Sequence, residues 1–298
     1  MLAIRTVLCP VDFSEATSRQ AHMAAALARL CGARLVLHHN LSALGVGAGV
    51  GWMWSDEKAP ITEERVAARL GDLATAIGPG VPIELRITEG PASSSVRAVS
   101  EAVDADVVVL CTHDAQSDDH ASVTATVLHH THRAVLALHE PSHDAGELRL
   151  EAGTGAPQVL LVPTDFSPES RQAVEFAFDL ARLLPLDVHL LHMVRRHEST
   201  HAEADRHLRA LVPPDFGSRV QVHVREGDAR EGIVATARDL NAACIVMGEH
   251  ARSLMRRWFS SDTSEGVLHA APCPVWYVPA GDLRVPVHEP VRRMDVRI

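Results

Sequence analysis

Short apolar runs alternate along this chain with longer segments in which apolar residues recur every three or four positions. In the first half the runs cover 7–11, 33–39, 106–110 and 134–138, and a further short run ends at Glu89-Gly90. In the second half they cover 160–163, 186–192, 243–247 and 275–278, and the additional run ends at Glu226-Gly227. Short, nearly continuous apolar strands separated by helices of about 10–15 residues predict parallel sheets that are covered on both faces.

The two halves repeat one another, which sets the domain organisation. Val7-Leu8-Cys9-Pro10-Val11-Asp12-Phe13-Ser14 in the first half matches Leu160-Leu161-Val162-Pro163-Thr164-Asp165-Phe166-Ser167 in the second, and Ser-Arg-Gln-Ala follows each. We therefore expect an α/β fold of two tandem, doubly wound, five-stranded parallel-sheet domains of the Rossmann-like kind. The expected limits are 1–140 for domain 1, 141–157 for a Gly- and Pro-containing linker, 158–280 for domain 2 and 281–298 for a C-terminal tail.

Composition and charge exclude several classes of protein. The formal net charge of −10 argues against a nucleic-acid binder, which usually carries a basic excess. Neither an apolar run of 18 residues nor a signal-peptide pattern is present, so we expect no membrane contact and a cytoplasmic location. Five scattered cysteines without a Cys-x-x-Cys pair are typical of reduced, buried thiols.

Candidate chemistry lies where the predicted strands end, because ligands of doubly wound sheets bind beyond the carboxyl ends of the strands. Asp12 and Asp165 each follow the first strand of their half. Two interpretations stay open for this position: a helix cap made by Asp or Ser, or direct contact of the Asp with a ligand. Gly248 follows another strand, and a polar loop leads from it to a helix near Asp262, an arrangement that can hold phosphate groups.

The 19 histidines form no recognisable metal-binding pattern, and the serine and cysteine residues form no recognisable catalytic motif. His129, His130 and His132 cluster, but only the first and last share a helical face, and surface histidines explain them without a metal. His38 and His39 alternate along a strand and so point to opposite faces of the sheet. Nucleophile-elbow and P-loop motifs are both lacking in the sequence, so we expect a binding protein with no catalytic residues and no metal ligands.

The chain resembles the universal stress protein family in a tandem two-domain form, over about residues 1–140 and 157–280. The resemblance rests on the Pro-x-Asp-Phe-Ser turns, on strands that end at His39 and His192, and on Val246-Met247-Gly248-Glu249-His250. It also rests on a closing block, Glu265-Gly266-Val267-Leu268-His269-Ala270-Ala271-Pro272-Cys273-Pro274-Val275. The resemblance implies a fold like that of the adenine nucleotide alpha hydrolases, a role in the stress response, and dimer contacts made through the last strand of each domain.

The same resemblance implies an adenine-nucleotide site in domain 2, with ATP as the expected cofactor. Members that bind nucleotide hold the phosphates in a Gly-x-x-Gly-x₉-Gly-Ser loop. Asp165 and Met193 match the positions that face the base and ribose, and the phosphate loop is matched by Gly248, His250, Ala251, Ser261, Asp262 and Thr263. Only the first loop glycine is kept, and Asp262 adds a negative charge that costs about 1–4 kcal/mol at ~4 Å from a phosphate oxygen.

Domain 1 departs further from the nucleotide-binding pattern. Cys111 stands where domain 2 has Gly248, Asp114 stands at the second glycine position, and the loop to Ser122 is shorter. We therefore expect no ATP site in domain 1 and at best a weakened site in domain 2. Three functions stay open: a nucleotide sensor, an interaction scaffold with unidentified protein partners, and a relative that binds a metal or another small molecule. The two last strands would pair within one chain as a pseudo-dimer, and a homodimer stays open as well.

Overall fold

The computed structural model describes residues 4–41, 62–90, 92–112, 127, 131–139, 148, 150, 157–194, 201–248 and 261–279. In the first half they form β1 (Thr6–Pro10), α1 (Thr17–Cys31), β2 (Arg34–Asn40), α2 (Glu63–Ile77), β3 (Ile83–Thr88), α3 (Ala92–Ala102), β4 (Val107–Thr112) and β5 (Ala134–His139). The order of strands and helices agrees with the alternation of apolar runs and helical periods in the sequence.

The second half repeats this order. It contains β6 (Gln158–Pro163), α5 (Pro168–Leu183), β7 (Leu186–Val194), α6 (His201–Ala210), the 3₁₀ turn η2 (Gly217–Arg219), β8 (Val220–Glu226), α7 (Ala229–Asp239), β9 (Cys244–Gly248), α8 (Ser261–Ala270) and β10 (Val275–Val278). The predicted repeat of one strand–helix unit is thereby confirmed for the described part of the chain.

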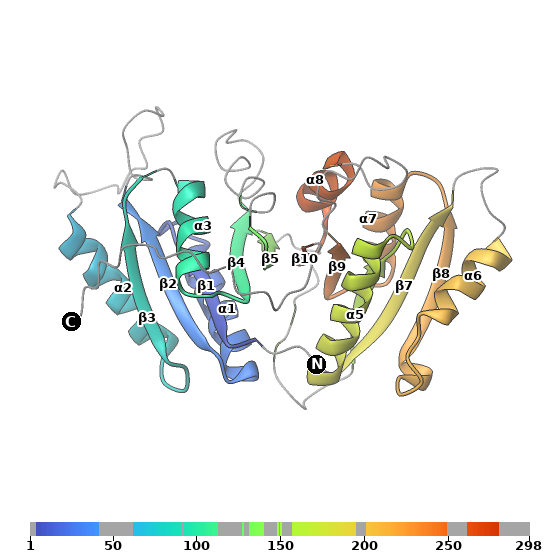
Figure 1. Ribbon diagram of the computed structural model, residues 1–298, viewed down its shortest axis with the longest axis horizontal. Coiled ribbons are helices and arrows are strands. Elements are labelled where there is room, and N and C mark those ends of the chain that lie inside the picture. The colour runs from blue at the N-terminus through green and yellow to red at the C-terminus, as the bar shows by residue number, and fades with distance from the viewer. Residues whose placement is uncertain are drawn as a thin grey trace.

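Each half forms a parallel five-stranded sheet, and the two sheets join into one. The strand order is β3-β2-β1-β4-β5 in the first half and β8-β7-β6-β9-β10 in the second, which is the doubly wound arrangement that we expected. β5 and β10 pair antiparallel, with Leu136 opposite Trp276 and Val135 opposite Tyr277. Figure 1 shows this seam at the centre of the molecule, with β3 and β8 at the two outer edges. The two last strands thus pair within one chain.

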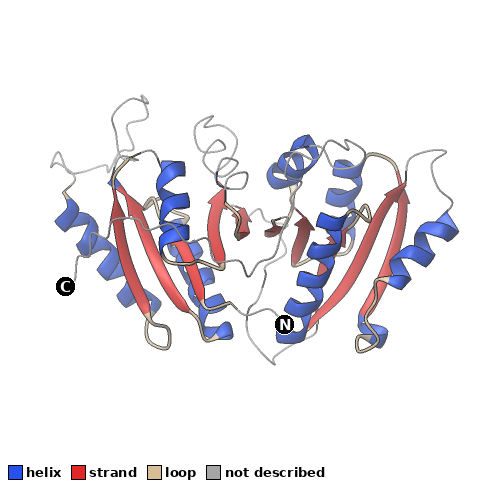
Figure 2. Cartoon of the chain, viewed as in Figure 1, coloured by secondary structure: helices blue, strands red, loops and turns tan. Residues whose placement is uncertain are grey.

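The core consists of two apolar layers, one on each face of the joined sheet. One layer includes buried side chains of α1, α2, α5 and α6, and the other includes buried side chains of α3, α7 and α8. Figure 2 shows helices on both faces of the strands in each half. Because both faces of the strands are covered, alternate residues of a strand enter opposite layers, which explains the continuous apolar runs. Each layer contains residues from both halves, so packing is continuous across the seam.

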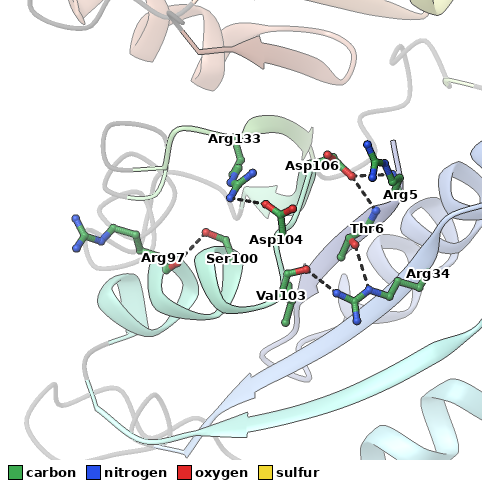
Figure 3. Close-up of polar contacts among 9 residues, drawn as sticks. All are labelled: Arg5, Thr6, Arg34, Arg97, Ser100, Val103, Asp104, Asp106 and Arg133. Atoms are coloured by element: carbon green, nitrogen blue, oxygen red, sulfur yellow. Dashed lines mark hydrogen bonds and ion pairs between the residues drawn. The ribbon is translucent and has the colours of Figure 1, made fainter. Parts of the chain in front are cut away.

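A polar network closes the amino-terminal edge of the first sheet, at the ends of the strands away from the candidate site (Figure 3). The Asp106 carboxylate accepts hydrogen bonds from the backbone N–H groups of Arg5, at 2.7 Å, and Thr6, at 3.0 Å. The Arg34 guanidinium donates to the Val103 carbonyl at 2.6 Å and to the Thr6 hydroxyl at 3.1 Å. These bonds tie the start of β1 to the starts of β2 and β4, so the charges of the network are structural.

Among the described residues, no helix is both long and apolar enough to cross a membrane.

Trp276 of the seam strand β10 provides a test of the packing beside the seam. Trp276 is fully buried and its ring centroid lies 5.1 Å from that of Phe176, a residue of α5. We expect Trp276→Ala to lower the free energy of unfolding by about 3–5 kcal/mol, because it removes a large buried side chain and leaves a cavity. Urea denaturation followed by circular dichroism measures this loss. Trp276→Phe is the control and should cost less; an alanine variant as stable as the parent would contradict the packing.

Candidate functional site

The candidate site lies at the carboxyl edge of each sheet, where the strand order reverses. This reversal falls between β1 and β4 in the first half and between β6 and β9 in the second. At such a point the loops leaving two neighbouring strands diverge and open a crevice for a ligand. Asp165 follows β6 there, and Gly248 ends β9. Asp12 and Cys111 stand at the corresponding places in the first half.

The turn after β6 is built from three polar side chains around a strained residue. Phe166 has φ 66°, a left-handed conformation that is rare for an aromatic residue. The Thr164 hydroxyl accepts the Phe166 N–H at 3.1 Å, and the Asp165 carboxylate accepts the Ser167 N–H at 3.0 Å. The Ser167 hydroxyl in turn accepts the N–H of Ser170 and caps α5. Ser167 is therefore the helix cap, whereas Asp165 stabilises the turn before it.

A histidine on the neighbouring strand holds the Phe166 ring in place. The ring centroids of Phe166 and His192 are 4.5 Å apart, and His192 Nδ1 donates to the Thr164 carbonyl at 2.7 Å. Burial lowers the pKa of His192, so the imidazole is neutral and carries its proton on Nδ1. The Phe166 ring is thus packed against the end of β7. The sequence contained both residues of this pair, but their contact in space was not predicted.

The first half builds the same turn from different neighbours. Phe13 has φ 61°, its ring centroid lies 4.7 Å from that of His39, and His39 Nδ1 donates to the Val11 carbonyl at 2.7 Å. The Arg69 guanidinium of α2 lies 4.5 Å above the Phe13 ring centroid. In the second half His207 of α6 contacts the Phe166 ring by its edge, with centroids 5.5 Å apart. The scaffold of the turn is shared, and the side chains outside it have diverged.

Gly248 brings β9 against the first turn of α5. A Cβ atom at this position would lie 2.5 Å from the Glu169 carbonyl oxygen and 3.0 Å from the Ser170 nitrogen, closer than real side chains come. The backbone of Gly248 does not adopt a positive φ. The small size of Gly248 thus lets the first turn of α5 approach the end of the strand.

At the corresponding position of the first half, Cys111 has the Cβ atom that Gly248 lacks. There α1 begins only at Thr17, after Ala16, which makes no side-chain cap. In the second half the residue that matches Ala16 is Glu169, which already belongs to α5. Gln20 of α1 also donates to the carbonyls of Pro10 and Val109, across the ends of β1 and β4. The crevice of the first half thus has a shorter helix and a buried amide at its base.

The profile of the universal stress protein family matches residues 3–139 and again 157–279. The chain belongs to the universal stress protein family. Universal stress protein Sll1654 of Synechocystis sp. is 27% identical over 134 residues, which cover 41% of this chain and 85% of that protein.

Two full-length solved structures resemble this universal stress protein in fold. A universal stress protein from Archaeoglobus fulgidus has a TM-score of 0.67 at 21% identity, with 93% of this chain and 97% of that chain covered. A protein of unknown function from Pseudomonas aeruginosa has a TM-score of 0.63 at 17% identity, with 94% of each chain covered. At such identities these likenesses concern the fold alone.

The site residues expected from the sequence fall into three groups in this universal stress protein. Asp165, Met193 and Gly248 all lie at the carboxyl edge of the second sheet, on three different strand ends. Residues 261–263, which are Ser261, Asp262 and Thr263, form the first turn of α8. His250 and Ala251 lie outside the described residues, as do Asp114 and Ser122 of the first half.

The tetrapeptides Ser-Arg-Gln-Ala are not structurally equivalent, although their sequences match. The buried positions of α1 and α5 align Thr17 with Ser170 and Gln20 with Ala173. The sequence match is therefore displaced by one residue from the structural one. The discrepancy matters because it places a buried amide at the base of one crevice and a methyl group at the base of the other.

Several histidines of the described residues make structural contacts. His38 bonds to the Thr88 hydroxyl through Nε2 at 2.8 Å, while its neighbour His39 bonds to the Val11 carbonyl, as expected for side chains on opposite faces of a strand. Within the described ranges, no group of three or more His, Cys, Asp or Glu side chains is arranged to hold a metal ion. His129 and His130 lie outside those ranges, and His132 is exposed.

Exchanging Gly248 for its first-half counterpart tests the helix approach. We expect Gly248→Cys to reduce the free energy of unfolding by about 1–3 kcal/mol, because the added atoms overlap the backbone of α5. Chemical denaturation measures the loss. Cys111→Gly serves as the reciprocal control. It should lower the free energy of unfolding by less, because a side chain is removed rather than added in a tight space. Equal stability of Gly248→Cys and the parent protein would refute the close approach.

Burial of histidines predicts loss of stability in acid. Burial lowers the pKa of His38 to about 4, and the pKa values of His39 and His192 are lowered by the same cause. In the unfolded chain histidine titrates near pH 6.5, so protons are taken up on unfolding below that value. The contribution of these buried histidines to the free energy of unfolding is therefore fully present above pH ~6.5, and it decreases as the pH falls toward about 4.

His38→Leu isolates one part of this effect, because Leu191 occupies the matching position of the second half. Between pH 6.5 and 5, the free energy of unfolding of the variant should fall by about 2 kcal/mol less than that of the parent protein. Urea denaturation at both pH values measures this difference. The reciprocal variant Leu191→His should steepen the pH dependence. A His38→Leu variant with the slope of the parent protein would show that this histidine does not titrate on unfolding.

Proposed function

We propose that this universal stress protein acts by binding rather than by catalysis, and that it binds one adenine nucleotide per chain, weakly, in the crevice of the second half. Family membership supports a role in the stress response. The observation that carries the proposal is the contact of Gly248 with the first turn of α5, beside the turn that holds Asp165. The two units that we infer, 1–140 and 158–280, would then have different functions.

Asp165 is the central residue of the proposed site. Its carboxylate is part-buried and is oriented by the Ser167 N–H, so little conformational entropy remains to be lost when a ribose hydroxyl binds. Thr164 and His192 fix the turn from below. By analogy with nucleotide-binding members of the family, we infer that the base and ribose would lie against this turn and against the end of β7, where Met193 lies.

The phosphate side of the proposed site is weaker. Gly248 retains the close approach of strand and helix, and α8 begins at Ser261 after the loop. Ala251 and Asp262 replace a glycine and a neutral residue of the nucleotide-binding pattern. We therefore infer a low affinity, in which contacts to the base and ribose dominate over contacts to the phosphates.

The first half lacks the corresponding support for a nucleotide. Cys111 replaces the glycine, and the residues before Thr17 do not continue α1 toward the crevice. The backbone N–H groups of an early helical turn, which attract anions, are thus arranged differently there. We infer that this half keeps the fold and the Phe13 turn but does not take ATP.

Titration of the full chain with ATP tests the assignment of the site. We expect one equivalent per chain, and Asp165→Ala should weaken binding at least about tenfold, which corresponds to about 1.4 kcal/mol. Asp12→Ala is the matched control at the same position of the first half and should leave the affinity unchanged. Absorbance of a heat-extracted sample would detect copurified nucleotide. Two equivalents per chain, or an equal effect of both variants, would contradict the proposal.

A further inference from the structure

Two histidines on the outer strands of the second half form a hydrogen-bonded pair. His189 Nδ1 of β7 and His223 Nε2 of β8 lie 3.0 Å apart, and the ring centroids are 5.0 Å apart with an interplanar angle of 24°. The two residues are 34 positions apart along the chain, so only the pairing of the strands brings them together. Both lie in the middle of their strands, away from the crevice at the carboxyl edge.

The pair lies on the face of the sheet that α7 covers, and one of its rings is within reach of solvent. Val188 and Leu190, the neighbours of His189, enter the layer of α5 and α6, so His189 points to the opposite face. His189 is buried, whereas His223 on the outer strand is only half-buried. A small solute can therefore approach the pair from the side of β8.

Both rings are neutral at neutral pH. Burial lowers the pKa of His189 and that of His223 below the ordinary histidine value. The bond between the rings then uses one N–H group and one nitrogen lone pair, and either ring can be the donor. Two neutral imidazole nitrogens thus face each other at short range, a state in which histidine binds metal ions.

The charged side chains around the pair are themselves paired. On β7, Asp187 lies 3.9 Å from Arg219 of η2. On β8, Arg225 lies 2.8 Å from Asp239 of α7. These two ion pairs place one negative and one positive group beside each strand, so their positive charges are balanced and a cation is not repelled by a net positive charge.

The separation of the two nitrogens suits a transition-metal ion. With metal–nitrogen bonds of about 2.0–2.1 Å, two adjacent ligands of a square-planar ion lie roughly 3 Å apart. His189 Nδ1 and His223 Nε2 are 3.0 Å apart. An ion would replace the shared proton: each ring would turn its lone pair toward the ion and carry its own proton on the other nitrogen. Binding to the neutral pair therefore changes the tautomer of one ring and releases no proton.

The first half has no such pair at the matching positions. The strand registers align His189 with Val36 and His223 with Arg86. Val36 is apolar and fully buried, and Arg86 forms an ion pair with Glu84. The histidine pair is thus a feature of the second copy alone, and the first copy shows which residues the fold accepts in its place.

We propose that His189 and His223 bind one divalent transition-metal ion, which links the edge strand β8 to β7. Within the described ranges no group of three or more His, Cys, Asp or Glu side chains is arranged around an ion, so water would fill the remaining positions. Cu²⁺ should bind most tightly, because affinities of nitrogen ligands peak at this ion. Mg²⁺, which prefers oxygen ligands, should not compete. The site revises the sequence-based expectation of no metal ligands and is independent of the proposed nucleotide site.

Titration of the full chain with Cu²⁺, followed by electron paramagnetic resonance, tests the site. The first equivalent should show coupling to imidazole nitrogen, and a large excess of Mg²⁺ should leave the spectrum unchanged. His223→Gln should weaken this binding at least about tenfold, because glutamine can keep the hydrogen bond to His189 but leaves a single imidazole. His22→Gln removes an exposed histidine of α1 and is the matched control, so its affinity should equal that of the parent protein.

A second variant guards against a loss of folding. His189→Val introduces the residue that the first half has at this position, so it should fold, as circular dichroism without metal would verify, and it should lose the site as well. Cu²⁺ affinity unchanged in both variants would overturn the proposal. So would a first-equivalent spectrum of the parent protein without nitrogen coupling, however the variants fold. ATP binding should be the same in all these proteins, so failure of the metal site would leave the proposed function untouched.

Discussion

The main-chain hydrogen bonds between β5 and β10 determine how the molecule is organised. Each half on its own would end in a strand with unpaired N–H and C=O groups, and such an edge readily recruits another strand. Here the two edges satisfy each other in antiparallel register, with Leu136 opposite Trp276. The apolar layers then continue from one half into the other. Both crevices are consequently held on one sheet rather than on two independently moving bodies.

On this shared sheet the two copies keep the same backbone and differ in the side chains around it. Phe13 and Phe166 adopt the same left-handed conformation and contact equivalent histidines. Strain of this kind persists where the surroundings enforce it. Differences occur at the carboxyl edge, where the strand registers align Cys111 with Gly248 and Asn40 with Met193. Both halves keep the same strand order in spite of these exchanges, which alter the contacts between strand ends and helices.

Much of the fold could be predicted from the sequence, because continuous apolar strands and repeated turn motifs report on local structure and burial. The same reasoning placed Asp165 and Gly248 at one edge, since each lies at or just after the end of a strand, whereas Met193 was named only from the family resemblance. It could not show why Gly248 must be small, because the Glu169 backbone that excludes a side chain is brought there only by tertiary packing. Likewise, the repeated Ser-Arg-Gln-Ala sequence aligns Gln20 with Gln172, whereas the buried faces of the helices align Gln20 with Ala173.

The covalent link between the halves changes the thermodynamics of the seam. Two separate subunits that met through such strands would associate according to their concentration and would come apart on dilution. In a single chain the partner strand is present at an effective concentration on the order of millimolar, whatever the abundance of the protein. The pairing of Val135 with Tyr277 is therefore a first-order event. A cell could not regulate this contact by changing how much of the protein it makes, and each copy is free to evolve its own crevice without losing its partner.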